Sequence, residues 1–341
     1  MITWRFCLFS EEEIMPGIPM LASSIVTDFF EGLWRLIEAI ILGIIEGITE
    51  WLPISSTGHL MLAGKVLKPF GDNQAFIELF EVVVQLGAIL AVCVIYFHKL
   101  NPWSKGKTPG QKHQTWILWA KVCLASIPIV IFGLIYEKVD AVHDFFHNSK
   151  IQPIIIACAL IFYGIAFIVV ENYFIPKRQP VNKFFKLTYR TAFFIGCIQV
   201  LSLIPGTSRS GVTILGAMLL GCTRRVSAEY TFFLGIPAMF GASGLKLLST
   251  LKDMYFDKNP AAELVTELSP ELASELGSKV EPAGVYDWFL FLVAMFVAFM
   301  VSMIAIRFLM DYVKRHNFTF FGWYRIALGV IVLIVAFTIG F

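Results

Sequence analysis

Charge is what this sequence has least of. Only 15% of its 341 residues are Asp, Glu, Lys or Arg, whereas a soluble domain carries roughly 25%. Hydrophobic residues make up 57% of the chain, and the mean hydropathy is +0.73. This composition excludes an ordinary soluble domain and favours a protein embedded in a membrane. The formal net charge is +2, which gives no electrostatic basis for binding nucleic acid.

Cysteine is scarce as well. The six cysteines are scattered, with no Cys-x-x-Cys spacing, so we expect neither a disulfide framework nor a thiolate metal site. The N-terminus does not have the pattern of a signal peptide, because Glu11, Glu12 and Glu13 interrupt its apolar start. We therefore treat residues 1–30 as an N-terminal extension and residues 31–341 as a single integral membrane domain.

Long apolar runs, by contrast, are abundant. A hydrocarbon core of about 30 Å is crossed by a helix of about 20 residues. Six stretches are long and apolar enough, and they predict six transmembrane helices. These are residues 76–97, 116–136, 151–171, 227–250, 286–308 and 322–341.

Two further apolar regions, 33–68 and 190–222, are broken in the middle. LPISSTG (52–58) interrupts the first and IPGTSRSG (204–211) the second. Each break leaves two arms of roughly 10–16 residues, too short to cross a membrane at 1.5 Å per residue. The sequence thus predicts an all-α polytopic membrane protein, with six transmembrane helices and two re-entrant helical hairpins.

Loop charges orient these spans by the positive-inside rule. The 98–115 and 171–190 loops are basic, and Arg325 belongs to the basic residues that flank the last connection. The segment 251–285 is an acidic insert that we expect outside the cytoplasm. These assignments agree with six crossings and both termini outside, with the two hairpins entering from opposite sides.

The two broken regions also align with each other. At an offset of 153, matched positions carry the same or a similar residue, and at an offset of 148 Glu81 and Gly87 match Glu229 and Gly235. The first set pairs Gly43 with Gly196, Glu46 with Gln199, Thr57 with Ser210 and Gly58 with Gly211. With the opposite entry sides, this predicts an inverted-topology repeat, of which 33–136 is the first half and 190–308 the second. Such repeats place a polar site where broken helices meet near the bilayer midplane.

Glu46 and Glu50 lie four residues apart and share one face of a helix. An ionised carboxylate at membrane depth costs about 2.5 kcal/mol or more, so two of them are not expected to face lipid. They could form structural hydrogen bonds, act as an acid and a base, or hold a hard divalent cation through oxygen.

Ser55, Ser56 and Thr57 precede a helix that we expect to start near Gly58. One of these hydroxyls can cap that helix, while the free N–H groups of its first turn can bind an anion. His59 follows directly. The histidine could be a satisfied buried residue, but beside these hydroxyls and carboxylates we interpret it as a catalytic or phosphate-contacting group.

The second break supplies the complementary chemistry. Residues 206–211 offer backbone amides, hydroxyls and the guanidinium of Arg209. An arginine at this depth needs an anionic partner, and its planar fork matches phosphate oxygens. The alternative is an ion pair with Glu46 or Glu50 in the empty site. A phosphate ester or anhydride would use both sets of groups, and a lipid tail would explain a site inside the membrane.

EGITEWLPISSTGH (46–59) and PGTSRSGVT (205–213) resemble the two signature motifs of the bacterial undecaprenyl-diphosphate phosphatases, the bacitracin-resistance family. The resemblance covers residues 33–250 and extends more loosely to the C-terminus. It implies a multi-pass protein of the bacterial cell membrane that converts the polyprenyl diphosphate to the monophosphate carrier used in cell-wall synthesis. The N-terminal extension and the acidic insert depart from the family pattern, but neither touches the motifs.

The resemblance and the residues together give a candidate site. The expected catalytic residues are Ser56, His59, Glu50, Glu46 and Arg209. The expected phosphate-binding residues are Ser55, Thr57, Gly206, Thr207, Ser208, Arg209 and Ser210. A Mg²⁺ or Ca²⁺ ion is expected near Glu46 and Glu50, and the polyprenyl diphosphate and membrane lipid are the expected partners.

Three matters stay open at this stage. Ser56 is the favoured nucleophile, with Glu50 or His59 as base, but direct attack by His59 is an alternative. A transporter of polyprenyl phosphate would need the same anion site, although it has little use for a cluster of hydroxyls, imidazole and carboxylates. The sequence also leaves open whether the protein forms a homo-oligomer.

Overall fold

The computed structural model describes residues 19–71, 74–139, 145–146, 148, 151–174, 181–255 and 284–338. In these ranges the chain is helical, apart from turns and an isolated parallel bridge between Val181 and Cys222. The long and medium helices are α1 (Pro19–Thr49), α2 (Ser56–Gly64), α3 (Gln74–Val83), α4 (Gln85–Ile95), α6 (Pro109–Lys138), α8 (Gln152–Val169), α9 (Tyr189–Gln199), α10 (Arg209–Leu219), α11 (Arg224–Tyr255), α14 (Val285–Arg315) and α15 (Thr319–Thr338). The short elements are α5 (Phe97–Leu100), η1 (Val170–Phe174), η2 (Phe184–Lys186) and η3 (Val200–Leu203).

The prediction of six membrane-spanning helices is confirmed. Six helical segments of the described chain are long and apolar enough to cross a bilayer: Phe76–Ile95, Pro109–Tyr136, Gln152–Phe174, Arg224–Lys252, Val285–Arg315 and Thr319–Thr338. Several of them extend beyond the expected apolar stretch, because caps and polar turns prolong a helix past its hydrophobic part. The Thr108 side chain caps α6 in a capping box with Gln111, and Pro109 takes the first helical position.

The first broken region differs in length from the expectation. Its leading helix, α1, has 31 residues instead of roughly 10–16. It begins at Pro19, so it includes part of the segment that the sequence assigned to an N-terminal extension. Asp28, Glu31, Arg35 and Glu38 lie between its start and its middle part, and residues 19–38 of α1 are therefore not an apolar span. The acidic insert of 251–285 lies outside the described residues, except for the end of α11 and the residues that begin α14.

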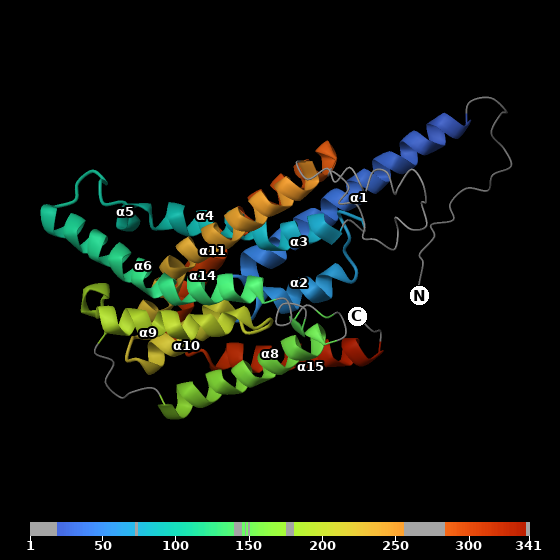
Figure 1. The fold of residues 1–341 in the computed structure, drawn as a ribbon. Coiled ribbons are helices and arrows are strands. Elements are labelled where there is room, and N and C mark those ends of the chain that lie inside the picture. The colour runs from blue at the N-terminus through green and yellow to red at the C-terminus, as the bar shows by residue number, and fades with distance from the viewer. Residues whose placement is uncertain are drawn as a thin grey trace.

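The helices pair in a regular way (Figure 1). Helix α1 packs along α14 and α9 packs along α6, while α8 packs along α15. Glycines allow the first two close approaches. A Cβ on Gly43 would lie 2.5 Å from the carbonyl oxygen of Ala294, and one on Gly196 would clash with that of Ala125. Gly43 and Gly196 are matched positions of the sequence repeat, so both halves use the same packing device.

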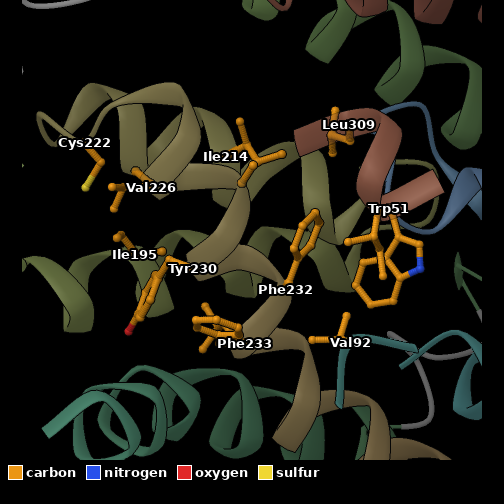
Figure 2. Packing of buried hydrophobic residues seen from close by; sticks show 14 of the residues in the cluster. Trp51, Val92, Ile195, Ile214, Cys222, Val226, Tyr230, Phe232, Phe233 and Leu309 are labelled. Carbon is orange, nitrogen blue, oxygen red and sulfur yellow. The ribbon is translucent and has the colours of Figure 1, made fainter. Parts of the chain in front are cut away.

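The first break contributes to a large cluster of buried hydrophobic residues, and Trp51 lies at one edge of the part shown in Figure 2. Trp51 is fully buried and meets Phe232 of α11 in a T-shaped contact, with ring centroids 5.2 Å apart. Val92 of α4 and Ile214 of α10 belong to the same cluster. Large hydrophobic side chains on the outward faces of α6, α14 and α15 are exposed, as expected for surfaces that contact lipid. Trp51, the residue after Glu50, is therefore anchored in a buried hydrophobic cluster that α4, α10 and α11 share.

Candidate active site

Two loops meet inside the bundle. The first loop, residues 50–55, connects α1 to α2, and the second loop, residues 204–208, connects η3 to α10. Each ends in a serine with positive φ, 75° at Ser55 and 66° at Ser208. Each serine caps the following helix, because its Oγ accepts from the amide of the glycine three residues later. The expected cap at the first break is thus confirmed, and the matching strained serines give both helix N-termini the same form.

Glu50 connects the two loops chemically. Its Oε1 accepts from Nη2 of Arg209 at 2.8 Å, and its Oε2 accepts from the Ser56 hydroxyl at 3.0 Å. Both side chains of the ion pair are largely buried, with 13% of Arg209 and 8% of Glu50 exposed. The sequence left open whether Arg209 pairs with Glu46 or with Glu50, and the structure brings it to Glu50.

The guanidinium of Arg209 is held from several sides. It donates to the carbonyl oxygen of Thr231 at 3.2 Å and contacts the sulfur of Met239 at 3.4 Å. Its carbon lies 5.9 Å from the centroid of the Trp51 ring. A Cβ on Gly235 would come within 2.5 Å of Nη1. Glycine at this repeat position therefore leaves room for the arginine.

Glu46 is fully buried, and neither of its carboxylate oxygens has a hydrogen-bond partner among the described residues. The same holds for the side-chain amide of Gln199, its counterpart in the sequence repeat. A buried carboxylate with free lone pairs fits a hard cation, which prefers oxygen ligands and takes the rest of its coordination from water or substrate phosphate. Glu50 is already engaged at both oxygens. In the described chain no cluster of three or more acidic, histidine or cysteine side chains forms a preformed cation site.

His59 is turned toward α15. Its Nδ1 lies 2.7 Å from the carbonyl oxygen of Ser55, and its Nε2 lies 2.7 Å from the hydroxyl of Tyr324. Both ring nitrogens therefore have protein partners in this state. The two aromatic rings are nearly parallel, at 8°, with centroids 5.7 Å apart.

The hydroxyls expected to bind phosphate fall into two groups. Ser208 and Ser210 lie together, Oγ to Oγ at 3.2 Å, and Ser210 also donates to the carbonyl of Leu52 in the first loop at 3.3 Å. Thr207 is buried beside Gly206, which has a φ of 84°. Thr57 is exposed on the first turn of α2, and the structure shows no hydrogen bond of its hydroxyl within the described chain.

Arg325 is a site residue that the sequence analysis assigned wrongly. It was grouped with the basic residues of a connecting loop, but it is fully buried on α15. Nη1 donates to the carbonyl of Pro53 at 3.3 Å, and Nη2 donates to Gly206 and Thr207, both at 3.0 Å. One side chain thus holds both loops. One sequence signal indicated its burial but not its partners, because Arg325 lies inside the predicted span 322–341.

A cavity of about 520 Å³ lies between α1, α2, α3 and the connection from α2 to α3. Leu42, Leu60 and Phe80 form apolar walls, while Lys65, Lys68 and Glu81 supply charge at its edge. It therefore combines an apolar lining with a few charged groups close to α2.

Known proteins resemble this chain over most of its length. The family model described as bacitracin resistance protein BacA matches residues 39–331. An undecaprenyl-diphosphatase of Lactococcus lactis subsp. cremoris (strain SK11) is 50% identical over 307 residues, which cover 88% of this chain and 96% of the relative. An undecaprenyl-diphosphatase of Streptococcus mutans serotype c is 50% identical over 306 residues, which cover 89% of this chain and 96% of the relative. An undecaprenyl-diphosphatase of Streptococcus pyogenes serotype M5 is 47% identical over 303 residues, which cover 89% of this chain and 97% of the relative.

The matched region contains both loops, all the residues around Glu50 and Arg209, and Arg325 on α15. With its six apolar helices the molecule is a multi-pass membrane protein. The chain belongs to the bacitracin resistance protein BacA family.

Proposed function

We propose that this protein is a membrane phosphatase that hydrolyses undecaprenyl diphosphate to undecaprenyl phosphate and inorganic phosphate. Its relatives carry the name undecaprenyl-diphosphatase at about half identity over nearly their whole length. The reaction would recycle the lipid carrier of cell-wall synthesis and would contribute to bacitracin resistance.

The observation that carries this function is the chain of contacts from Ser56 through Glu50 to Arg209. A hydroxyl that donates a hydrogen bond to a carboxylate is the arrangement of a nucleophile and its general base. A guanidinium at the other carboxylate oxygen is where phosphate charge would be stabilised. These three groups come from α2, the first loop and α10, and they meet within hydrogen-bond distance.

The bound diphosphate would first compete with Glu50 for Arg209. Once Arg209 and the amides at the start of α10 hold the phosphate, Glu50 loses its ion pair, and its carboxylate keeps only the hydrogen bond from Ser56. Ser56 Oγ then attacks the terminal phosphorus and its proton passes to Glu50. The bond from that phosphorus to the bridging oxygen breaks, and undecaprenyl phosphate leaves with the bridging oxygen and takes up the proton from Glu50. This restores the Glu50 carboxylate for the second step.

Water completes the cycle. It attacks the phosphorus of the phosphoserine and gives a proton to the active-site base, while the bond to Ser56 Oγ breaks and the serine recovers its proton. Inorganic phosphate is the second product. Glu46 would hold a Mg²⁺ or Ca²⁺ ion, which supplies neutralising charge to the diphosphate when bound. His59, fixed by Ser55 and Tyr324, would support the first turn of α2.

Phosphate release from detergent-purified protein tests this function. Wild type should release phosphate from farnesyl or undecaprenyl diphosphate with divalent metal present. Glu50→Gln should lower turnover by about 100-fold or more, as expected for removal of a transition-state electrostatic contact. Glu229→Gln is a matched control, because the largely buried Glu229 carboxylate also forms an ion pair, with Lys99, and contacts neither Arg209 nor Ser56 among the described residues. Movement of labelled lipid without any hydrolysis would instead favour the transporter alternative, to which the relatives' names give no support.

The finer topology is also a proposal. We infer an inverted-topology repeat in which α1–α2 and α9–α10 form re-entrant hairpins. In its support, the pairing of α1 with α14 mirrors that of α9 with α6, and Ser55 and Ser208 have the same unusual backbone form. Glu81 and Glu229, matched in sequence, each line a cavity, one beside α2 and one beside α5.

Orientation follows from loop charge. The basic 98–108 connection and the start of α11 lie at the same end of the bundle in Figure 1. By the positive-inside rule this end faces the cytoplasm of the bacterial cell membrane, both termini lie outside, and the first hairpin enters from the outer face. A diphosphate released outside the cell would then reach the site directly.

A further inference from the structure

A separate cavity lies between α5, the first half of α6 and the beginning of α11. Its volume is about 590 Å³. Five of its lining residues are basic: Lys99, Lys107, Lys121, Lys183 and Arg225. Glu229 is the one carboxylate in its lining. No residue assigned to catalysis lines this cavity, so the proposed reaction does not account for it.

The carboxylate is already neutralised. Glu229 forms an ion pair with Lys99, whose ammonium also lies 3.9 Å from the centroid of the Phe184 ring. Lys107 donates to neutral acceptors, the carbonyl of Asn101 at 2.9 Å and the hydroxyl of Thr115 at 2.8 Å among them. The positive charge of the cavity is therefore left largely uncompensated.

Lys121 is the residue that most strongly indicates an anion-binding site in this cavity. It is only 4% exposed, and its ammonium lies 5.5 Å from the centroid of the Tyr189 ring. Within the described residues neither Lys121, Lys183 nor Arg225 has a carboxylate partner. Buried charges are normally paired. Burial also lowers the pKa of the nearby Lys99 and Lys107 below their ordinary values, so an anion in the cavity would stabilise the charged forms of these lysines.

The surroundings place the cavity near lipid headgroups. Trp103 and Trp116, on the adjoining loop and on α6, are 73% and 52% exposed, and their rings meet at 5.4 Å in a T-shaped contact. Trp119 anchors the same region by donating to the carbonyl of Leu100 at 2.8 Å. Exposed tryptophans of a membrane protein gather at the level of the headgroups.

We propose that this cavity binds the phosphate group of an anionic membrane lipid. Lysines provide point charges and Arg225 a planar fork for phosphate oxygens, and basic pockets between transmembrane helices suit such headgroups. Free inorganic phosphate shares this chemistry. The apolar walls made by Ile117, Phe184 and Phe185 and the neighbouring tryptophans favour the lipid, because they fit the start of its acyl chains.

Native mass spectrometry of the full-length, detergent-purified protein can measure this binding. The probes are phosphatidylglycerol and phosphatidylcholine with identical acyl chains, each titrated with and without millimolar inorganic phosphate. The first variants are Lys183→Gln and Arg225→Gln, since both residues are exposed and their replacement leaves the core intact. Lys121→Gln probes the buried position. Lys314→Gln, a half-exposed lysine outside the cavity, is the control.

Wild type should retain phosphatidylglycerol in preference to phosphatidylcholine, and phosphate should not displace it. Each cation removed should weaken that binding about five-fold, and the Lys183→Gln/Arg225→Gln double variant about 25-fold, while Lys314→Gln should bind like wild type. Equal retention of the two lipids, or an equal loss in the control, would overturn the proposal. Displacement of phosphatidylglycerol by inorganic phosphate would overturn the lipid as the ligand and assign the cavity to free phosphate.

Discussion

Arg325 lies behind the second loop and donates to the carbonyl oxygen of Thr207 at 3.0 Å. In a trans peptide the carbonyl and the following N–H point in opposite directions. The amide of Ser208 is therefore turned away from Arg325, and no acceptor for it is seen among the described residues. The buried arginine thus keeps a backbone donor free at the N-terminus of α10, where Arg209 also lies, and an anion would bind there.

Arg325→Met should destabilise the protein and abolish activity. The change leaves the carbonyls of Pro53, Gly206 and Thr207 without their donor, and each unpaired buried group costs about 1–3 kcal/mol. We expect a loss of at least ~3 kcal/mol in stability, measured as a lower midpoint of thermal unfolding in detergent. Arg307→Met, at an exposed position on α14, should stay within about 0.5 kcal/mol of wild type. An equal effect of the two substitutions would contradict the role assigned to Arg325.

Arg209→Lys should rescue activity poorly. The guanidinium contacts Glu50, Thr231 and Met239 at once, and an ammonium cannot reproduce that fork. We expect phosphate release to fall about 100-fold in both Arg209→Ala and Arg209→Lys. Near-normal turnover in the lysine variant would mean that this position supplies charge alone.

Much of this arrangement could be predicted from sequence. The six apolar runs predicted the spans, and the residues within the two breaks allowed an ion pair of Arg209 with Glu46 or Glu50. A carboxylate and a guanidinium at membrane depth need partners, but the choice between Glu46 and Glu50 came only from the structure, in which Arg209 contacts Glu50. Local sequence indicated that one hydroxyl of Ser55, Ser56 and Thr57 caps the helix after the first break, and in the structure it is Ser55. The matching cap by Ser208 was not predicted.

What could not be predicted depends on long-range packing. Tyr324 and Arg325 are more than 260 residues from the first loop in sequence, and no local pattern indicates that α15 reaches it. Arg325 was wrongly grouped with loop charges because its neighbours in the sequence, such as Arg315, do flank a connection. The length of α1 was also missed, because the charged residues between Asp28 and Glu38 interrupt the hydrophobic pattern on which the prediction was based.

Glu46→Gln should lower the affinity of the enzyme for the divalent metal more than its affinity for the substrate. The Glu46 carboxylate has no protein partner in the described chain, so its proposed role is to hold a divalent cation. After treatment with EDTA and readdition of Mg²⁺, the variant should need at least ~10-fold more metal for half-maximal phosphate release. The KM for farnesyl diphosphate at saturating metal should change little. An unchanged metal titration would show that Glu46 is not a ligand.

Sidedness can be tested with two exposed positions in a cysteine-free background. Val285 is 90% exposed at the start of α14. The thiol of the Val285→Cys variant should react with an impermeant thiol reagent on intact cells. His113, exposed near the start of α6 beside the basic connection, should react as His113→Cys only after lysis, because lysine-rich loops resist translocation. The reverse pattern would invert the proposed topology, and labelling of both on intact cells would indicate dual orientation.

The most direct test of the proposed mechanism is to trap the covalent intermediate. The enzyme would be quenched in acid during turnover of diphosphate labelled on its terminal phosphate, then digested and mapped by mass spectrometry. Ser56 donates a hydrogen bond to Glu50, and both ring nitrogens of His59 have protein partners. This geometry predicts an acid-stable phosphoester on Ser56 that is absent from Ser56→Ala. Acid-labile phosphate on His59, or full turnover by Ser56→Ala, would contradict it.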